Sequence, residues 1–200
     1  MILPIVAYGD PILKEVAQEI DASYPELNVL IENMFETMYE ASGVGLAAPQ
    51  IGLGIRLFIV DATRIADGDD DDDDEYTDEE RAMLKTFKKA FINPIIIEEE
   101  GREWHFEEGC LSIPHIREDV FRKPKVVIEY YDENFELKEE VLDGIAARIV
   151  QHEYDHLEGV LFTDKLNPLK RRLLRKRLAD ISRGNLDVGY KMKFPLKGKK

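Results

Sequence analysis

The sequence predicts an α+β fold in which mostly antiparallel strands surround helices. Apolar residues recur every three or four positions at residues 25–41, at residues 143–158 and from residue 167 onward, which is the helical period. Between residues 56 and 138, short runs rich in Ile, Val, Phe and Tyr favour strands instead. With 200 residues and 44% hydrophobic composition, the chain suits one domain with a sizeable core.

The N-terminal part predicts a wrapping segment followed by a helix. Residues 1–24 mix short apolar pieces with turn signals, and we expect them to wrap the domain. The helix covers residues 25–41, with Pro25 in its first turn and Gly43 after its end. Its apolar stripe is interpreted as core and consists of Leu27, Leu30, Ile31, Met34, Phe35 and Met38.

A glycine-rich segment links this helix to the first predicted strand. Residues 43–54 contain four glycines, which permit unusual backbone angles and the close approach of another chain. No Lys-Ser/Thr pair follows them, so a phosphate-binding loop is a poor alternative. Residues 56–61 then predict a strand.

A strongly acidic run at residues 67–78 interrupts the strands. Six consecutive aspartates, Asp69 to Asp74, are followed by Glu75 and repel one another. The spaced ligands, the glycine and the closing glutamate of an EF-hand are absent, which makes calcium binding the weaker interpretation. We expect a solvated loop inserted between two strands.

Further strands are predicted downstream of the acidic run. Residues 87–98 and 101–107 favour strands about a turn at Glu100-Gly101. Residues 126–131 and 135–138 predict a hairpin, because a polar three-residue turn separates them.

The helix predicted over residues 143–158 carries the pattern H-E-x-x-H at residues 152–156. On a helix, its two histidines lie on one face, one turn apart, and they continue an apolar face that includes Ile145 and Ile149. Two imidazoles so placed can bind one divalent metal, and Glu153 could take a proton from a water molecule whose pKa the metal lowers. An amphipathic helix with two surface histidines would also produce the pattern.

A catalytic metal site needs a third protein ligand and one open position. The metzincin pattern would require a histidine where this chain has Phe162, and no glutamate occurs after Glu158. The single cysteine, Cys110, is therefore the best candidate, because a thiolate is a strong ligand for zinc or iron. His105 and His115 are poorer candidates.

Three separated motifs of the chain are similar to those of peptide deformylases. They are Gly43-Val44-Gly45-Leu46-Ala47-Ala48-Pro49-Gln50, Glu108-Gly109-Cys110-Leu111-Ser112 and Gln151-His152-Glu153-Tyr154-Asp155-His156. The resemblance runs from residue 2 to about residue 167. It implies that the helix with the two histidines is central. It also implies an enzyme that removes the formyl group from the N-terminal methionine of a new polypeptide and releases formate.

Cys110, His152 and His156 are the expected metal ligands, and Glu153 is expected to take a proton from water and pass it to the leaving amine. Two imidazoles and a thiolate suit zinc on simple grounds. The resemblance favours ferrous iron in the cell, with zinc, nickel or cobalt in some preparations. A thiolate on iron in an open site is prone to oxidation.

The resemblance also implies roles for residues around the metal. The oxyanion donors would be the side-chain amide of Gln50 and the backbone N–H of Leu111. Arg117 follows Cys110 by seven residues, as an arginine does in the family, and would brace the site. Substrate contacts are expected from Val44, Gly45, Glu108, Gly109, Ile145 and Ile149.

The C-terminal part is basic. A last helix is expected from Asn167-Pro168 to about Ser182, with Leu169, Leu173, Leu174, Leu178 and Ile181 as its apolar side. Its other faces carry Lys170, Arg171, Arg172, Arg175, Lys176 and Arg177. Residues 165–200 contain 13 Lys or Arg and two Asp, a net charge of +11; the total of −14 leaves −25 for residues 1–164.

This charge asymmetry predicts a catalytic domain over residues 1–166 and a basic helix and tail over residues 167–200, reaching an anionic partner. Deformylases are known to dock on ribosomes through a C-terminal helix, so the resemblance implies the ribosome surface as that partner. A solvated helix with a disordered tail is the alternative. No DNA or membrane partner is expected.

The chain is expected to be cytoplasmic. A single cysteine allows no internal disulfide and suits a reducing compartment. The N-terminus shows no signal peptide, and no stretch approaches the roughly 18 apolar residues of a membrane span.

Two rival functions stay open. One is a metallopeptidase that cuts internal peptide bonds, which is weakened by the missing downstream ligand. The other is a non-catalytic protein with a structural metal, which would not need Glu153.

Overall fold

The computed structural model describes residues 1–66 and 77–196. Most of the predicted acidic loop lies outside these ranges. Its last two residues are described: Thr77 caps a helix and Asp78 begins it, which corrects the predicted end at residue 78. The helix α3 covers Asp78–Leu84, and the side chain of Thr77 accepts a hydrogen bond from the Glu80 N–H while Glu80 accepts one from the Thr77 N–H. This reciprocal capping begins the helix directly after the acidic run.

The main sheet has five strands in the order β2-β3-β4-β7-β8, and every neighbouring pair is antiparallel. The strands are β2 (Gly45–Ala47), β3 (Leu57–Asp61), β4 (Lys88–Glu100), β7 (Lys125–Tyr131) and β8 (Leu137–Leu142). A second antiparallel sheet pairs β5 (Trp104–Cys110) with β6 (Ile113–Arg122). The predicted α+β class with mostly antiparallel strands is thus confirmed, as is the hairpin formed by β7 and β8.

One predicted strand is misplaced, and several strands were not predicted, of which β6 is the longest. The strand expected over residues 101–107 is β5, which begins at Trp104 and pairs with β6 rather than with β4. Gly101, with a φ of 91°, lies in the turn between them. Because β6 carries Arg117, Glu118 and Asp119 in its middle, its apolar residues are too sparse to produce a strand signal.

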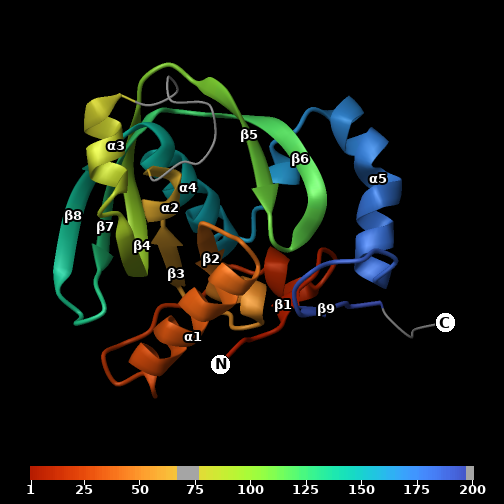
Figure 1. The fold of residues 1–200 in the computed structure, drawn as a ribbon, viewed down its shortest axis with the longest axis horizontal. Coiled ribbons are helices and arrows are strands. Elements are labelled where there is room, and N and C mark those ends of the chain that lie inside the picture. Colours follow the sequence, from red (N-terminus) through yellow and green to blue (C-terminus); the bar gives the residue numbers. More distant parts are fainter. Residues whose placement is uncertain (67–76, 197–200) are drawn as a thin grey trace.

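The helix α4 (Gly144–Leu157) lies inside the molecule, between the main sheet and the β5–β6 hairpin (Figure 1). Asp143 begins it by accepting a hydrogen bond from the Gly144 N–H, as its N-cap role predicts. Gly159 follows its end with a φ of 67°, and a Cβ there would lie 2.6 Å from the Lys14 carbonyl oxygen. The chain therefore leaves the helix through a bend that favours glycine.

The helix α1 (Leu27–Glu40) packs against β2 and β3 with the predicted stripe toward the core. It begins two residues later than expected, after Glu26, which adopts a left-handed conformation. A short helix, α2 (Thr63–Ala66), follows β3.

The helix α5 (Pro168–Arg183) runs along the outside of β6 at the edge of the molecule (Figure 1). Leu174, Leu178 and Ile181 are buried, but Leu169 and Leu173 are 68% and 72% exposed, so the apolar side is narrower than predicted. Positions 174, 178 and 181 share one face, and a helix turns Leu173 about 100° away from Leu174. No helix in the described ranges is both long enough and apolar enough to cross a bilayer.

The two ends of the chain meet. The strand β9 (Met192–Lys193) pairs in parallel with β1 (Ile5–Val6), with hydrogen bonds of 2.9 Å from the Ile5 N–H to the Lys191 carbonyl and from the Ala7 N–H to the Lys193 carbonyl. Contacts therefore cross the boundary predicted at residue 166, and the division into two parts stays a prediction.

Candidate active site and metal centre

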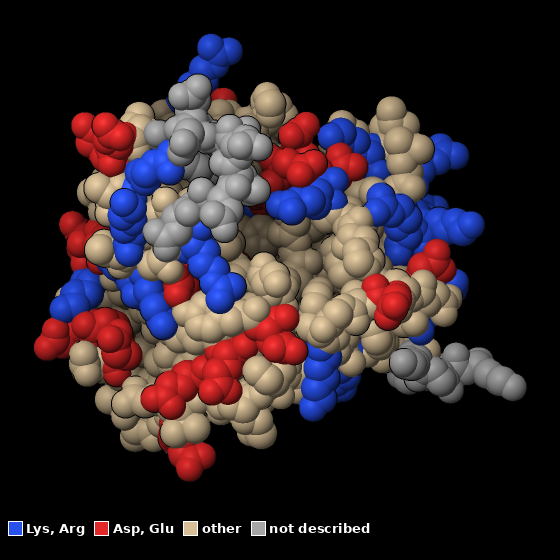
Figure 2. All heavy atoms as spheres, viewed as in Figure 1, with Lys and Arg blue, Asp and Glu red and all other residues tan. Residues whose placement is uncertain are grey.

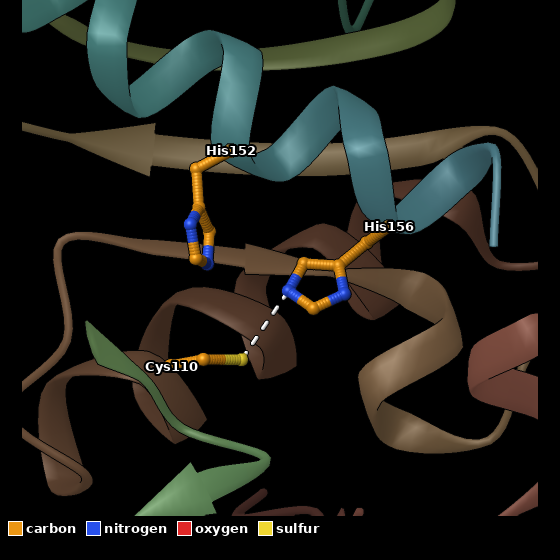
Figure 3. Close-up of side chains that lie close together, drawn as sticks. All are labelled: Cys110, His152 and His156. Carbon is orange, nitrogen blue, oxygen red and sulfur yellow. Dashed lines mark hydrogen bonds between the residues drawn. The ribbon is translucent and has the colours of Figure 1, made fainter. Parts of the chain in front are cut away.

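One strand and one helix bring the three predicted ligands together. Cys110 is the last residue of β5, and His152 and His156 project from α4 toward it (Figure 3). Their ligand atoms all lie within 4.8 Å of one another, and the Cys110 Sγ is 3.4 Å from the His156 Nε2. Among the described residues, this is the one cluster of three or more such side chains that could hold a metal ion. A thiolate and two imidazoles suit a four-coordinate divalent metal with one open position.

The two weaker ligand candidates lie elsewhere. The His105 Nδ1 is 3.7 Å from the Asp119 carboxylate in an exposed pair. The His115 Nε2 hydrogen-bonds to the Asp187 carbonyl at 2.7 Å. Neither belongs to the cluster.

A buried charge network orients His152. Its Nδ1 lies 2.9 Å from Glu108 Oε2; a carboxylate can only accept, so Nδ1 carries a proton and Nε2 faces the cluster. Arg122 donates to both Glu108 oxygens at 2.7 and 2.9 Å, and Arg148 donates to one at 2.9 Å. Burial alone would raise the Glu108 pKa, but the hydrogen bonds from Arg122 and His152 hold it well below its ordinary value.

Neither arginine of this network is predicted from the sequence. The family resemblance instead implies that Glu108 is a wall of the substrate pocket and that Arg117 braces the site. Glu108 does line the cavity, but its carboxylate forms a buried ion pair with Arg122. Arg117 is exposed and forms its ion pair with Glu107 at 3.1 Å. The sequence does contain one sign of this network. Arg148 lies between Ile145 and Ile149 on a helix face that must be buried, and a buried arginine needs an acidic partner.

The two histidines differ in charge. Burial lowers the pKa of His156 well below its ordinary value, which leaves the neutral form that binds metals. Burial also opposes a charge on His152, but hydrogen bonds with Cys110 and Glu108 raise its pKa to about 10. A metal ion would therefore displace a proton from the cluster as it binds.

Glu153 lies beside the ligands on the buried side of α4. Burial raises its pKa to about 7, and its Oε2 has no hydrogen-bond partner among the described residues. Gly45 of β2 makes room for it, because a Cβ at that position would lie 2.7 Å from the Glu153 Cδ. A buried, unpaired carboxylate oxygen with this pKa suits proton transfer near neutral pH.

Gln50 is held at one end and directed into the site at the other. Its Oε1 accepts a hydrogen bond from the Ala47 N–H at 2.8 Å. Its Nε2 is 3.4 Å from the Cys110 Sγ and 3.4 Å from the Ser112 Oγ. The donor end of the amide therefore faces the ligand cluster. Leu111 follows Cys110 in the turn between β5 and β6 and also lines the cavity.

A cavity of about 860 Å³ is lined by Gln50, Cys110, Leu111, His152 and Glu153. Its lining includes all six predicted substrate-contact residues: Val44, Gly45, Glu108, Gly109, Ile145 and Ile149. It also reaches Arg64, Ile65 and Arg81 of α2 and α3, which were not predicted. Figure 2 shows the molecule hollowed near the centre of this face, with side chains of both charges around the opening. Such a volume accommodates a side chain and several residues of an extended peptide.

An HExxH helix, a cysteine beside its two histidines and a buried carboxylate with one unpaired oxygen, all next to a cavity, define a metal-dependent hydrolase. Comparison with known proteins identifies the family. The model of the polypeptide deformylase family matches residues 2–172. The chain is 58% identical over 195 residues to a peptide deformylase of Christiangramia forsetii, covering 98% of this chain and 97% of that protein. It is 57% identical over 194 residues to that of Flavobacterium johnsoniae, covering 97% and 96%.

Solved structures agree with this assignment. A peptide deformylase from Legionella pneumophila superposes with a TM-score of 0.74 at 36% identity, covering 92% of this chain and 98% of that one. The inhibitor complex of the Plasmodium falciparum peptide deformylase gives 0.72 at 34% identity, covering 88% and 97%. The chain belongs to the peptide deformylase family. It removes the N-formyl group from nascent polypeptides and releases formate, so a peptidase or a purely structural metal protein is set aside.

We predict that Gly45→Ala will lower kcat/KM roughly a hundredfold, because the new methyl group must displace the Glu153 carboxylate and small misplacements at a reacting centre are that costly. Gly54→Ala is the matched control, since a Cβ there has ordinary contacts, the nearest being the Ile12 Cδ1 at 3.7 Å. Formate release by the two variants, at equal metal content, is the measurement. Equal activity would mean that Glu153 can act from another position.

Proposed function

We propose that Cys110, His152 and His156 hold the metal of this deformylase and that Glu153 is its general base. The observation that carries the proposal is the Glu153 oxygen that lacks a partner among the described residues, buried beside the ligand cluster. When bound, a divalent metal lowers the pKa of water toward neutrality and polarises a carbonyl. Glu153 takes the proton of the attacking water and then delivers it to the leaving amine.

The oxyanion that forms at the formyl group needs hydrogen-bond donors. We assign this role to the Gln50 Nε2 and the backbone N–H of Leu111. The 2.8 Å hydrogen bond from the Ala47 N–H to Gln50 Oε1 supports the first assignment, because it leaves the amide nitrogen as the end available to the site. The apolar walls formed by Val44, Ile145 and Ile149 suit a methionine side chain.

We predict that Glu153→Gln will keep its metal and lose activity by a factor on the order of a hundred or more, since an amide fills the space but cannot accept the proton. Formate release and bound metal are measured on the same sample. Glu107→Gln, which changes an exposed carboxylate directly before the cysteine motif, is the control and should stay near wild type. A metal-loaded Glu153→Gln enzyme with normal turnover would refute the role of Glu153.

For the metal itself, we propose ferrous iron, the choice that the family resemblance favours; the ligand set by itself suits zinc equally well. We predict that apoprotein reconstituted without oxygen will be most active with Fe²⁺, and that exposure to air will reduce this activity because an iron thiolate oxidises. Reconstitution with Fe²⁺, Ni²⁺, Co²⁺ and Zn²⁺ gives the order. Equal or greater activity with Zn²⁺ would remove the case for iron.

We further propose that α5 docks on ribosomal RNA phosphates, which would place the enzyme in the cytoplasm. Lys and Arg side chains gather at the edge of the molecule where α5 lies (Figure 2). Arg171, Arg172, Arg175 and Arg183 line a second cavity of about 640 Å³ along the helix. In the described part of the chain none of these four forms an ion pair, so their charges are available to phosphates. The charge of −25 on residues 1–164 would be repelled, so the enzyme would approach with this helix first.

We predict that changing Arg171, Arg172 and Arg175 to Gln will weaken co-sedimentation with ribosomes and reduce its salt dependence, since fewer counterions are released. Turnover of a short formyl-Met peptide should not change. Arg177 is kept because it donates to the His115 carbonyl.

The matched control changes Lys85, Arg102 and Lys123, which lie outside α5, to Gln, and so loses the same three positive charges. Fractionation of cells tests the cytoplasmic location. Sedimentation of the α5 variant at the wild-type level would show that this helix is only a solvated surface.

A further inference from the structure

The C-terminal segment contacts the motif that carries Cys110. The Tyr190 hydroxyl donates a hydrogen bond of 2.7 Å to the Leu111 carbonyl, and Tyr190 lines the same cavity as Cys110 and His152. Two further contacts join the same parts of the chain, from Arg177 to the His115 carbonyl and between His115 and the Asp187 carbonyl. Residues predicted to form a separate basic tail are therefore in contact with the active-site loop.

Leu111 and Ser112 are the central residues of a tight turn. Cys110 at the end of β5 and Ile113 at the start of β6 are register partners, which leaves two residues to reverse the chain. In a β-turn, the carbonyl of the first central residue belongs to the peptide that rotates between turn types, and that carbonyl makes no hydrogen bond within the turn. Here that carbonyl belongs to Leu111, and Tyr190 holds it in one orientation.

The opposite end of the chain holds the other side of the turn. The Tyr8 N–H donates to the Ser112 carbonyl at 2.8 Å. Tyr8 follows β1 and Tyr190 precedes β9, so both of the chain ends that pair as β1 and β9 also contact the turn. Burial raises the pKa of Tyr190, which keeps its hydroxyl protonated as a donor.

Movement of this turn would disturb two groups of the site. The Leu111 N–H and the Leu111 carbonyl are joined through one Cα, so a contact that anchors the carbonyl also restrains the position of the N–H. A displaced turn would move that N–H, together with the Ser112 Oγ, which lies 3.4 Å from the Gln50 Nε2. The Leu111 side chain is confined as well, because a Cβ on Gly43 would lie 2.8 Å from its Cδ1. Tyr190 is the contact that restrains the carbonyl of this peptide.

We infer that Tyr190 is a positioning residue of the deformylase reaction: by holding the Leu111 carbonyl, it fixes the turn that presents the Leu111 N–H to the oxyanion. The inference rests on the oxyanion role proposed for Leu111. It makes the C-terminal segment part of the active site, although none of its residues is a ligand or a proton carrier. Such a residue stabilises the transition state more than bound substrate, so its loss lowers kcat rather than raising KM.

Tyr190→Phe tests this inference, since it removes one oxygen and keeps the ring against the cavity wall. The expected result is a kcat about tenfold lower, a smaller loss than the roughly hundredfold caused by removing an oxyanion donor itself. KM and metal content should stay at wild-type values. In the zinc-loaded protein, the NMR amide resonance of Leu111 should shift, which reports the turn without reference to turnover.

Tyr130→Phe is the matched control. The Tyr130 hydroxyl also makes a 2.7 Å hydrogen bond, to Glu140 away from the site, and Glu140 keeps its partner Lys89. This variant should lose melting temperature to a similar extent, with kcat and the Leu111 resonance unchanged.

A Tyr190→Phe enzyme with wild-type kcat, or with a loss of activity that follows a loss of metal, would overturn the inference. A failure of the proposed mechanism would be seen separately, as normal turnover by Glu153→Gln with Tyr190 intact.

Discussion

The rest of the site depends on the buried carboxylate of Glu108. A charge in the interior is tolerated only when its partners satisfy it, and removing one partner from such a pair typically costs about 3–5 kcal/mol. Glu108 lies on β5, Arg122 on β6, and Arg148 and His152 on α4. Because these four residues come from three elements, the network aligns the helix that carries two of the proposed ligands with the strand that carries the third. It also sets which nitrogen of His152 faces the metal position.

The second constraint is the closeness of β2 to α4. Val44 and Gly45 line the cavity from one side, and Glu153 faces Gly45 from the other. The missing side chain of Gly45 lets the carboxylate approach the backbone of β2. The same closeness keeps water away from Glu153, which is why burial raises its pKa to about 7. The contact between Gly45 and Glu153 thus determines both how closely β2 packs on α4 and how strongly the Glu153 carboxylate holds a proton.

The meeting of the chain ends bears on how this deformylase is organised. The pairing of β1 with β9 ties residues that follow α5 to the turn after Cys110. The helix α5 also contacts β6 close to this turn, because Arg177 donates a hydrogen bond to the His115 carbonyl. The sequence alone suggests that the basic C-terminal part and the turn after Cys110 are independent. In the structure, hydrogen bonds connect them.

From the sequence alone, the periodicities determined the three long helices, the α+β class and the β7–β8 hairpin, because these signals are local. Ligand spacing in the H-E-x-x-H pattern, together with a single cysteine, identified the cluster of Cys110, His152 and His156, since few residues of those types are available. Only the tertiary structure decided the partners of Glu108, the exposure of Leu169 and the contact of Tyr190 with Leu111. These depend on which distant segments meet, and a charged strand such as β6 or a tail of mixed composition carries no periodic signal of where it will pack.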